Sequence, residues 1–97
     1  MSRPRPVYWG INESNQFSHA LSNLSNDLKI IYAEKIDNMI HSKNPVGHGD
    51  KWERTRYGQV WMVRLNDYYR FSYFIDGKSK TIHLIRLGSH KDVCTER

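Results

Sequence analysis

The sequence contains a single cysteine, Cys94, among its 97 residues. One thiol cannot form an internal disulfide, which fits a reducing compartment, and it cannot supply the paired ligands of a structural zinc site. No apolar run approaches the roughly 18 residues that a transmembrane helix needs, so we expect no membrane span. No apolar stretch follows the basic N-terminus, so we expect no secretory signal. These features predict a cytoplasmic protein without membrane contact.

Standard catalytic motifs are also missing. The sequence has no Gly-rich phosphate loop, no nucleophile elbow and no His-Glu-x-x-His pair. Any chemistry must therefore come from side chains that the fold brings together. We expect neither a metal nor a cofactor.

Aromatic and basic residues are plentiful by comparison. Hydrophobic residues make up 38% of the chain and aromatic residues 12%, enough for one domain that spans residues 1–97. Pro4 and Pro6 predict a flexible tail over residues 1–6. Fifteen Lys and Arg against ten Asp and Glu give a formal charge of +5. That excess favours an anionic partner such as nucleic acid, a ribosome or an acidic protein, although some basic domains bind nothing.

The apolar pattern predicts an α+β fold. Val7–Trp9 is a strand candidate, Asn12 is a predicted N-cap with Glu13 in the first helical turn, and a second helix is expected over about 27–41. After a Gly- and Pro-containing loop at 44–50 the apolar period changes from 3.6 to 2. The predicted strands then span 51–56, 60–65, 69–75 and 81–87. We expect the N-terminal strand and helical hairpin to pack on a twisted antiparallel sheet of three or four further strands.

A three-residue hairpin loop at 66–68 would fix the register of two strands. Leu65 would then face Tyr69, and Arg64 would face Arg70. Alternation puts one apolar set on the face that the helices cover, namely Trp61, Val63, Leu65, Tyr69, Phe71 and Tyr73. The other face carries the two opposed arginines, which repel each other unless an anion lies between them.

Basic residues on this second face suit metal-free RNA cleavage. In that reaction a 2′-hydroxyl attacks the neighbouring phosphorus, a base removes its proton, and an acid protonates the leaving oxygen. Arg64, Arg70 and Arg86 could stabilise the phosphoryl oxygens, because planar guanidinium groups match them. His90, in a predicted polar loop over 88–92, has an ordinary pKa near 6.5 that suits proton transfer. Tyr68 could stack on an exposed base.

Structural roles remain open for the same residues. Arg64 and Arg70 could be ordinary exposed strand residues, and Arg86 could anchor its strand to Asp67 or Asp92. His83 lies between apolar neighbours, which favours a structural histidine. His48 could be a plain loop residue. Most tyrosines fit the core better than a base platform.

Two segments resemble the RelE/ParE toxin superfamily. Val60–Tyr73 resembles the central hairpin of RelE-type toxins, where a Trp, a basic residue and a Tyr-Arg pair recur around the turn. Ile82–Val93 resembles the last strand and catalytic loop, with a Gly-Ser-His form similar to YafQ-like members. The resemblance covers about residues 7–94. It implies the toxin of a type II toxin–antitoxin pair, cleaving mRNA at the ribosomal A site, with an antitoxin as partner in a hetero-oligomer.

The resemblance also implies site residues. Arg70 matches the phosphate-stabilising arginine, Arg64 a basic position on the preceding strand, His90 the catalytic His or Arg, and Asp67 an acidic turn residue. RNA contacts are expected from Lys91, Arg86, Tyr68 and His48, of which His48 has only a loose counterpart in the family. Cys94 departs from the pattern, because many members have Tyr or Phe there. Two alternatives stay open: a ParE-type toxin that inhibits gyrase without nuclease activity, because it shares the fold, and a catalytically weakened RelE relative, which Cys94 favours.

Overall fold

The protein is described here from a computed structural model, which covers residues 6–45, 50–55 and 58–89, with backbone alone for 50–55. Within these residues the elements follow in the order β1 (Gly10–Glu13), α1 (Asn15–Ser22), α2 (Asn26–Ile40), β2 (Asp50–Thr55), β3 (Gly58–Arg64), β4 (Tyr69–Asp76) and β5 (Thr81–Ser89). No helix in this part of the chain is long and apolar enough to cross a membrane.

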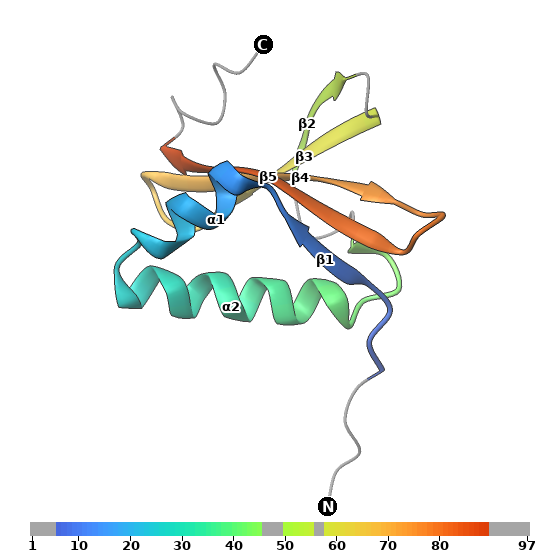
Figure 1. Ribbon diagram of the computed structural model, residues 1–97, viewed down its shortest axis with the longest axis horizontal. Helices are drawn as coiled ribbons and strands as arrows, with labels where there is room; N and C mark the ends of the chain where they lie inside the picture. The colour runs from blue at the N-terminus through green and yellow to red at the C-terminus, as the bar shows by residue number, and fades with distance from the viewer. Residues whose placement is uncertain (1–5, 46–49, 56–57, 90–97) are drawn as a thin grey trace, which may run out of the picture.

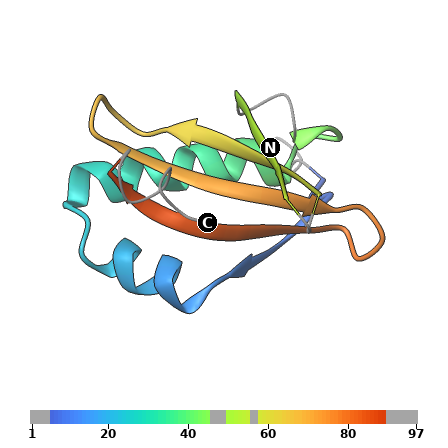
Figure 2. The ribbon, with the colours of Figure 1, turned by 90° about the horizontal axis from the view of Figure 1, so that it is seen from above.

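The strands form one mixed sheet in the order β1-β5-β4-β3-β2. Strands β2 to β5 are antiparallel neighbours in chain order, whereas β1 pairs with β5 in parallel at one edge. Figures 1 and 2 show both helices on the same side of this twisted sheet. The predicted α+β architecture is therefore confirmed.

A cluster of aromatic rings fills the space between the helices and the sheet. Phe17 from α1, Tyr32 from α2 and Phe71 from β4 lie with ring centroids 5.6–5.9 Å apart in tilted or edge-on contacts. Tyr73 extends the cluster, with its centroid 6.2 Å from that of Phe71. Such contacts add to the free energy gained by burying large apolar side chains, so this cluster is the centre of the core.

The β3–β4 register agrees with the prediction from the sequence. Arg64 pairs with Arg70, Val63 with Phe71 and Trp61 with Tyr73. The Leu65 N–H donates to the Tyr69 carbonyl over 2.9 Å, which closes the loop at residues 66–68. The helix-facing side chains at 63, 65, 71 and 73 are buried, as expected.

The N-terminal boundaries were predicted wrongly. The first strand is not Val7–Trp9, because Gly10 is the first residue to join the ladder, where it donates to Lys80 O over 2.8 Å. Tyr8 N–H instead donates to the carbonyl of Ile40 at the end of α2, over 2.8 Å. Asn12 is not an N-cap, since pairing with β5 holds it in the extended β1.

Ser14 is the residue that caps α1. Its Oγ accepts a hydrogen bond from Phe17 N–H at 3.1 Å and donates to the carbonyl of Ile85 in β5 at 2.6 Å. The same hydroxyl therefore begins the helix and fastens it to the sheet. Ser25 caps α2 through a 3.3 Å bond from Leu28 N–H, with no bond to the sheet among the described contacts.

Comparing the two capping serines isolates the tertiary bond. We expect Ser25→Ala to cost about 1 kcal/mol of unfolding free energy, the usual value of an N-cap. Ser14→Ala should cost about 1 kcal/mol more, because it also leaves the Ile85 carbonyl without its donor. Urea unfolding of both variants measures the difference. Equal losses would contradict a stabilising bond between Ser14 and β5.

Tyr32 and Glu13 form a polar contact between α2 and β1. The Tyr32 hydroxyl donates to one Glu13 carboxylate oxygen at 3.2 Å, and Ser18 Oγ donates to the other at 2.8 Å. Burial, and to a lesser extent the Glu13 charge, raises the pKa of Tyr32 above its ordinary value of 10. The folded state therefore resists ionisation of this phenol.

Because the pKa of Tyr32 is raised, the free energy of unfolding should depend on pH in the alkaline range. Below about pH 10 Tyr32 is neutral in both states, so it adds no slope. Above this pH the unfolded chain releases the proton and the folded chain keeps it, so the free energy of unfolding should fall. Urea unfolding at pH 9 to 11 should show this fall, and Tyr32→Phe should reduce it. The exposed Tyr68, changed to Phe, is the matched control and should leave the slope unaltered.

Candidate functional site

The sheet face opposite the helices, here called the open face, carries most of the polar strand residues. Register and side-chain alternation place side chains from β1, β3, β4 and β5 on it. The described ones are Asn12, Val60, Met62, Arg64, Arg70, Ser72, Phe74, Asp76, Thr81, His83 and Arg86. Figure 2 looks onto the sheet from above, with α2 behind it. Met62 and Ser72 are buried even though they lie away from the helices.

Arg64 and Arg70 are direct cross-strand neighbours on this face. Arg64 is exposed and Arg70 is half-buried. Neither has an ion pair with a carboxylate among the described residues. Like charges in opposed positions destabilise a sheet, so this pair is unfavourable unless it meets an anion.

The environment of Arg70 adds to this imbalance. Its Nε is buried and has no hydrogen-bond partner within the described residues, and its Nη1 lies 3.9 Å from the Met62 sulfur, a weak acceptor. Leaving a buried donor unsatisfied costs about 1–3 kcal/mol. On β5 the neighbour of Arg70 is Gly88, which is itself buried. Within the described residues Arg70 thus combines a like-charged cross-strand neighbour with a buried, unsatisfied donor.

Arg86 and His83 continue the open face along β5. Arg86 lies opposite Ser72, and His83 lies opposite Phe74. One residue, Ile85, is added at a bulge between these two pairs, so both Arg86 and His83 keep the same side of the sheet. The His83 ring stacks on Phe74 and bonds to Asn12, which agrees with the structural role favoured from the sequence.

The β3–β4 turn presents Asp67 and Tyr68 at its tip. The Asn66 carboxamide oxygen accepts hydrogen bonds from Tyr68 N–H at 2.8 Å and Tyr69 N–H at 2.6 Å. This bonding orders the turn, a role that sequence reasoning did not assign to Asn66. Tyr68 is 62% exposed and meets Tyr69 edge-on, while Asp67 is exposed. The other tyrosines that the structure describes, Tyr8, Tyr32, Tyr69 and Tyr73, are buried or half-buried, as expected.

The rest of the predicted site lies outside the described residues, which include neither His48, His90, Lys91 nor Cys94. One boundary nearby is corrected. The polar loop was predicted to begin at Gly88, but β5 continues through Ser89, because Gly88 and Ser89 pair with Arg70 and Tyr69.

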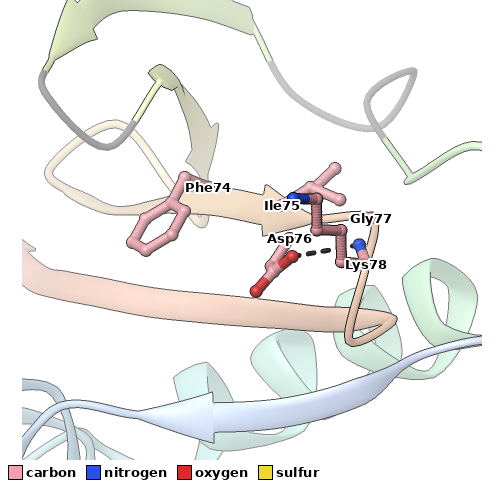
Figure 3. Close-up of a pocket in the computed structure, with 5 residues that line it drawn as sticks. All are labelled: Phe74, Ile75, Asp76, Gly77 and Lys78. Carbon is pink, nitrogen blue, oxygen red and sulfur yellow. Dashed lines mark hydrogen bonds between the residues drawn. The ribbon is translucent and has the colours of Figure 1, made fainter.

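A shallow hollow at the far end of β4 is lined by residues 74–78 (Figure 3). Asp76 accepts hydrogen bonds there from Lys78 N–H at 3.0 Å and Ser79 N–H at 3.4 Å. These hydrogen bonds lower the pKa of the Asp76 carboxyl, and the bonds with Ser79 have the largest effect. This arrangement is an Asx turn. We therefore interpret the hollow as a structural feature of the turn that joins β4 to β5.

Comparison with known proteins identifies the fold. No family model matches the sequence, and no curated protein matches it. Among solved structures, a chain of the archaeal RelE–RelB complex from Pyrococcus horikoshii superposes with a TM-score of 0.70 at 24% identity, over 86% of this chain and 96% of that one. The RelBE2 toxin–antitoxin complex from Mycobacterium tuberculosis gives 0.68 at 17% identity, over 89% and 95%.

A third match, the YoeB/ParE toxin from Agrobacterium tumefaciens, gives a TM-score of 0.69 at 13% identity, over 84% of this chain and 98% of that one. The fold is therefore that of the RelE-like toxins. This confirms, for the fold, the resemblance seen in the two sequence segments.

Proposed function

We propose that this chain is the toxin of a type II toxin–antitoxin pair and acts as an endoribonuclease on mRNA at the ribosomal A site. The observation that carries the proposal is Arg70, whose buried Nε has no acceptor among the described residues and whose strand neighbour is a second cation. A phosphodiester offers the acceptor oxygens and the negative charge that this pair lacks.

The proposed mechanism is attack by a 2′-hydroxyl on the adjacent phosphorus. Arg70 and Arg64 stabilise the charge that develops on the phosphoryl oxygens. His90 donates a proton to the 5′-oxygen as its bond to phosphorus breaks, and a base accepts the proton of the attacking 2′-hydroxyl. Among the described residues, the carboxylate of Asp67 at the hairpin tip is the group we propose for that base. Arg86, Lys91, His48 and the exposed Tyr68 contact the RNA around the cleaved bond.

We further propose a protein partner, an antitoxin that covers the open face when the toxin is inactive. Two of the matching structures are toxin–antitoxin complexes, which supports a hetero-oligomer. An acidic or helical segment that pairs with Arg64 and Arg70 would remove their repulsion. The proposed location is the cytoplasm, where mRNA and ribosomes are found.

Mapping of mRNA ends tests this function directly. Induced expression in a bacterial host should arrest growth and produce new ends inside translated frames, detected by primer extension. His90→Ala, expressed to the same level, should produce neither effect.

A gyrase-inhibiting toxin is the second candidate, because one matching structure is named as a YoeB/ParE toxin. In that case growth would stop with intact mRNA, a DNA-damage reporter would respond, and His90→Ala would remain toxic. A weakened relative would cause no arrest.

A further inference from the structure

We propose that Phe74 and His83 form a nucleobase platform on the open face, which holds one base of single-stranded RNA beside the arginines. This inference rests on the proposed function, since it names a further contact to the same substrate. It also assigns a ligand to His83, whose contacts within the protein, with Phe74 and Asn12, were interpreted above as structural.

The two rings already form a stack. Their centroids are 4.6 Å apart and their planes differ by 13°, and both side chains are half-buried. Phe74 covers one face of the imidazole, and we place the added base against the opposite face of this half-buried ring. Nucleobases stack on aromatic side chains in most single-strand-binding proteins, because every base presents a flat π-face. A base that joins this stack would lie against His83.

Asn12 sets the hydrogen-bonding character of the imidazole. Its side-chain amide nitrogen lies 3.0 Å from His83 Nδ1. When that amide donates, Nδ1 is the acceptor, and a neutral ring carries its proton on Nε2, the other ring nitrogen. His83 then offers a donor at Nε2, suited to a base carbonyl, a ring nitrogen or a phosphate oxygen.

The platform is aligned with the arginines. The pair Ser72–Arg86 comes next along the same face, and Arg70 lies one pair beyond it. Two residues of strand span about 7 Å, so Arg86 is about one such step from the platform and Arg70 about two. In the other direction the next open-face position is Asp76, an acidic residue that would repel phosphate. The charge pattern therefore places RNA from the platform toward Arg70.

An abasic scan tests the platform. Fluorescent oligoribonucleotides of one fixed sequence, with 2′-O-methyl groups throughout that block attack by the 2′-oxygen, receive one abasic residue at each position in turn. For wild type we expect one abasic position to weaken binding by about tenfold, measured by fluorescence anisotropy. His83→Ala should weaken binding of the intact oligonucleotide by the same factor and become insensitive to that position.

Two further variants sharpen the result. His83→Phe keeps a flat ring, so it should retain sensitivity to the abasic position. His19→Ala removes an exposed histidine on α1, in the helical layer, and should bind like wild type. Circular dichroism of each variant verifies folding. If His83→Ala does not fold, Phe74→Leu takes its place in the binding assay, because it keeps an apolar side chain but removes the ring.

Cleavage of a translated mRNA by the same proteins separates this inference from the proposed function. No binding of the oligonucleotides, or an abasic effect that persists unchanged in His83→Ala, would overturn the platform even if wild type cleaves mRNA. Base-dependent binding that requires His83, together with no mRNA cleavage, would support the platform and overturn the nuclease.

Discussion

Replacing Arg70 by alanine is expected to lower mRNA cleavage by about 100- to 1,000-fold, while the folded state loses little or no stability. The rate loss is that of removing one preorganised donor from a developing oxyanion. Arg70 lies opposite Arg64, and its Nε is buried without a partner in the described part of the chain. Its removal therefore relieves a repulsion and an unsatisfied donor.

This combination distinguishes a functional arginine from a structural one. Cleavage of a reporter mRNA in a translating extract gives the rate, and urea unfolding gives the stability. Lys78→Ala, at an exposed cation beyond the other end of β4, is the matched control and should leave both unchanged. Full cleavage by Arg70→Ala, or a stability loss of several kcal/mol without a loss of rate, would contradict the role assigned to Arg70.

Phe71→Ala is expected to cost about 3–5 kcal/mol, the largest loss of stability among the substitutions considered. Phe71 is 0% exposed and contacts the rings of Phe17, Tyr32 and Tyr73. The substitution leaves a cavity where both helices meet the sheet. Since small domains have a total stability of about 5–15 kcal/mol, much of the chain should unfold at modest urea concentrations.

Ile30→Ala provides the control for the helical layer. Ile30 lies on α2 and is 59% exposed, so its truncation should cost less than about 0.5 kcal/mol. Urea unfolding of both variants at one temperature gives the comparison. A loss below about 1 kcal/mol for Phe71→Ala would mean that the aromatic cluster is not the centre of the core.

The β3–β4 hairpin could be predicted from the sequence because its information is local. Alternation of apolar side chains, with a three-residue loop, determines the pairing of Arg64 with Arg70 without reference to the rest of the chain. The second helix was predicted for the same reason, since its apolar spacing lies within one continuous segment of the chain.

The N-terminal segment could not be predicted because its structure depends on distant residues. Gly10–Glu13 becomes a strand by pairing with Thr81–Leu84, about 70 positions later in the chain. The sequence alone made Asn12 a good helix cap, whereas the fold turns it toward His83. The bulge at Ile85, which brings Arg86 and His83 onto one face, left no recognisable signal either.

The candidate site likewise contains residues that local sequence indicates and residues that only the folded structure brings out. Arg64 and Arg70 were proposed from the hairpin alone, and Arg86 from its place in the last strand. Asn66 was missed as the residue that orders the turn, because its effect depends on hydrogen bonds to Tyr68 and Tyr69 rather than on a motif. The platform of Phe74 and His83 became visible only when β4 and β5 were aligned.

The most direct test of the central claim, that the open face cleaves RNA by 2′-hydroxyl attack, is a single-atom change in the substrate. A translated mRNA would carry one 2′-deoxynucleotide immediately 5′ of the mapped cleavage site, with the all-ribose message as its partner. The account predicts that wild-type protein cuts the all-ribose message at this phosphate and leaves the deoxy-substituted one intact there. Equal cleavage of both would contradict it.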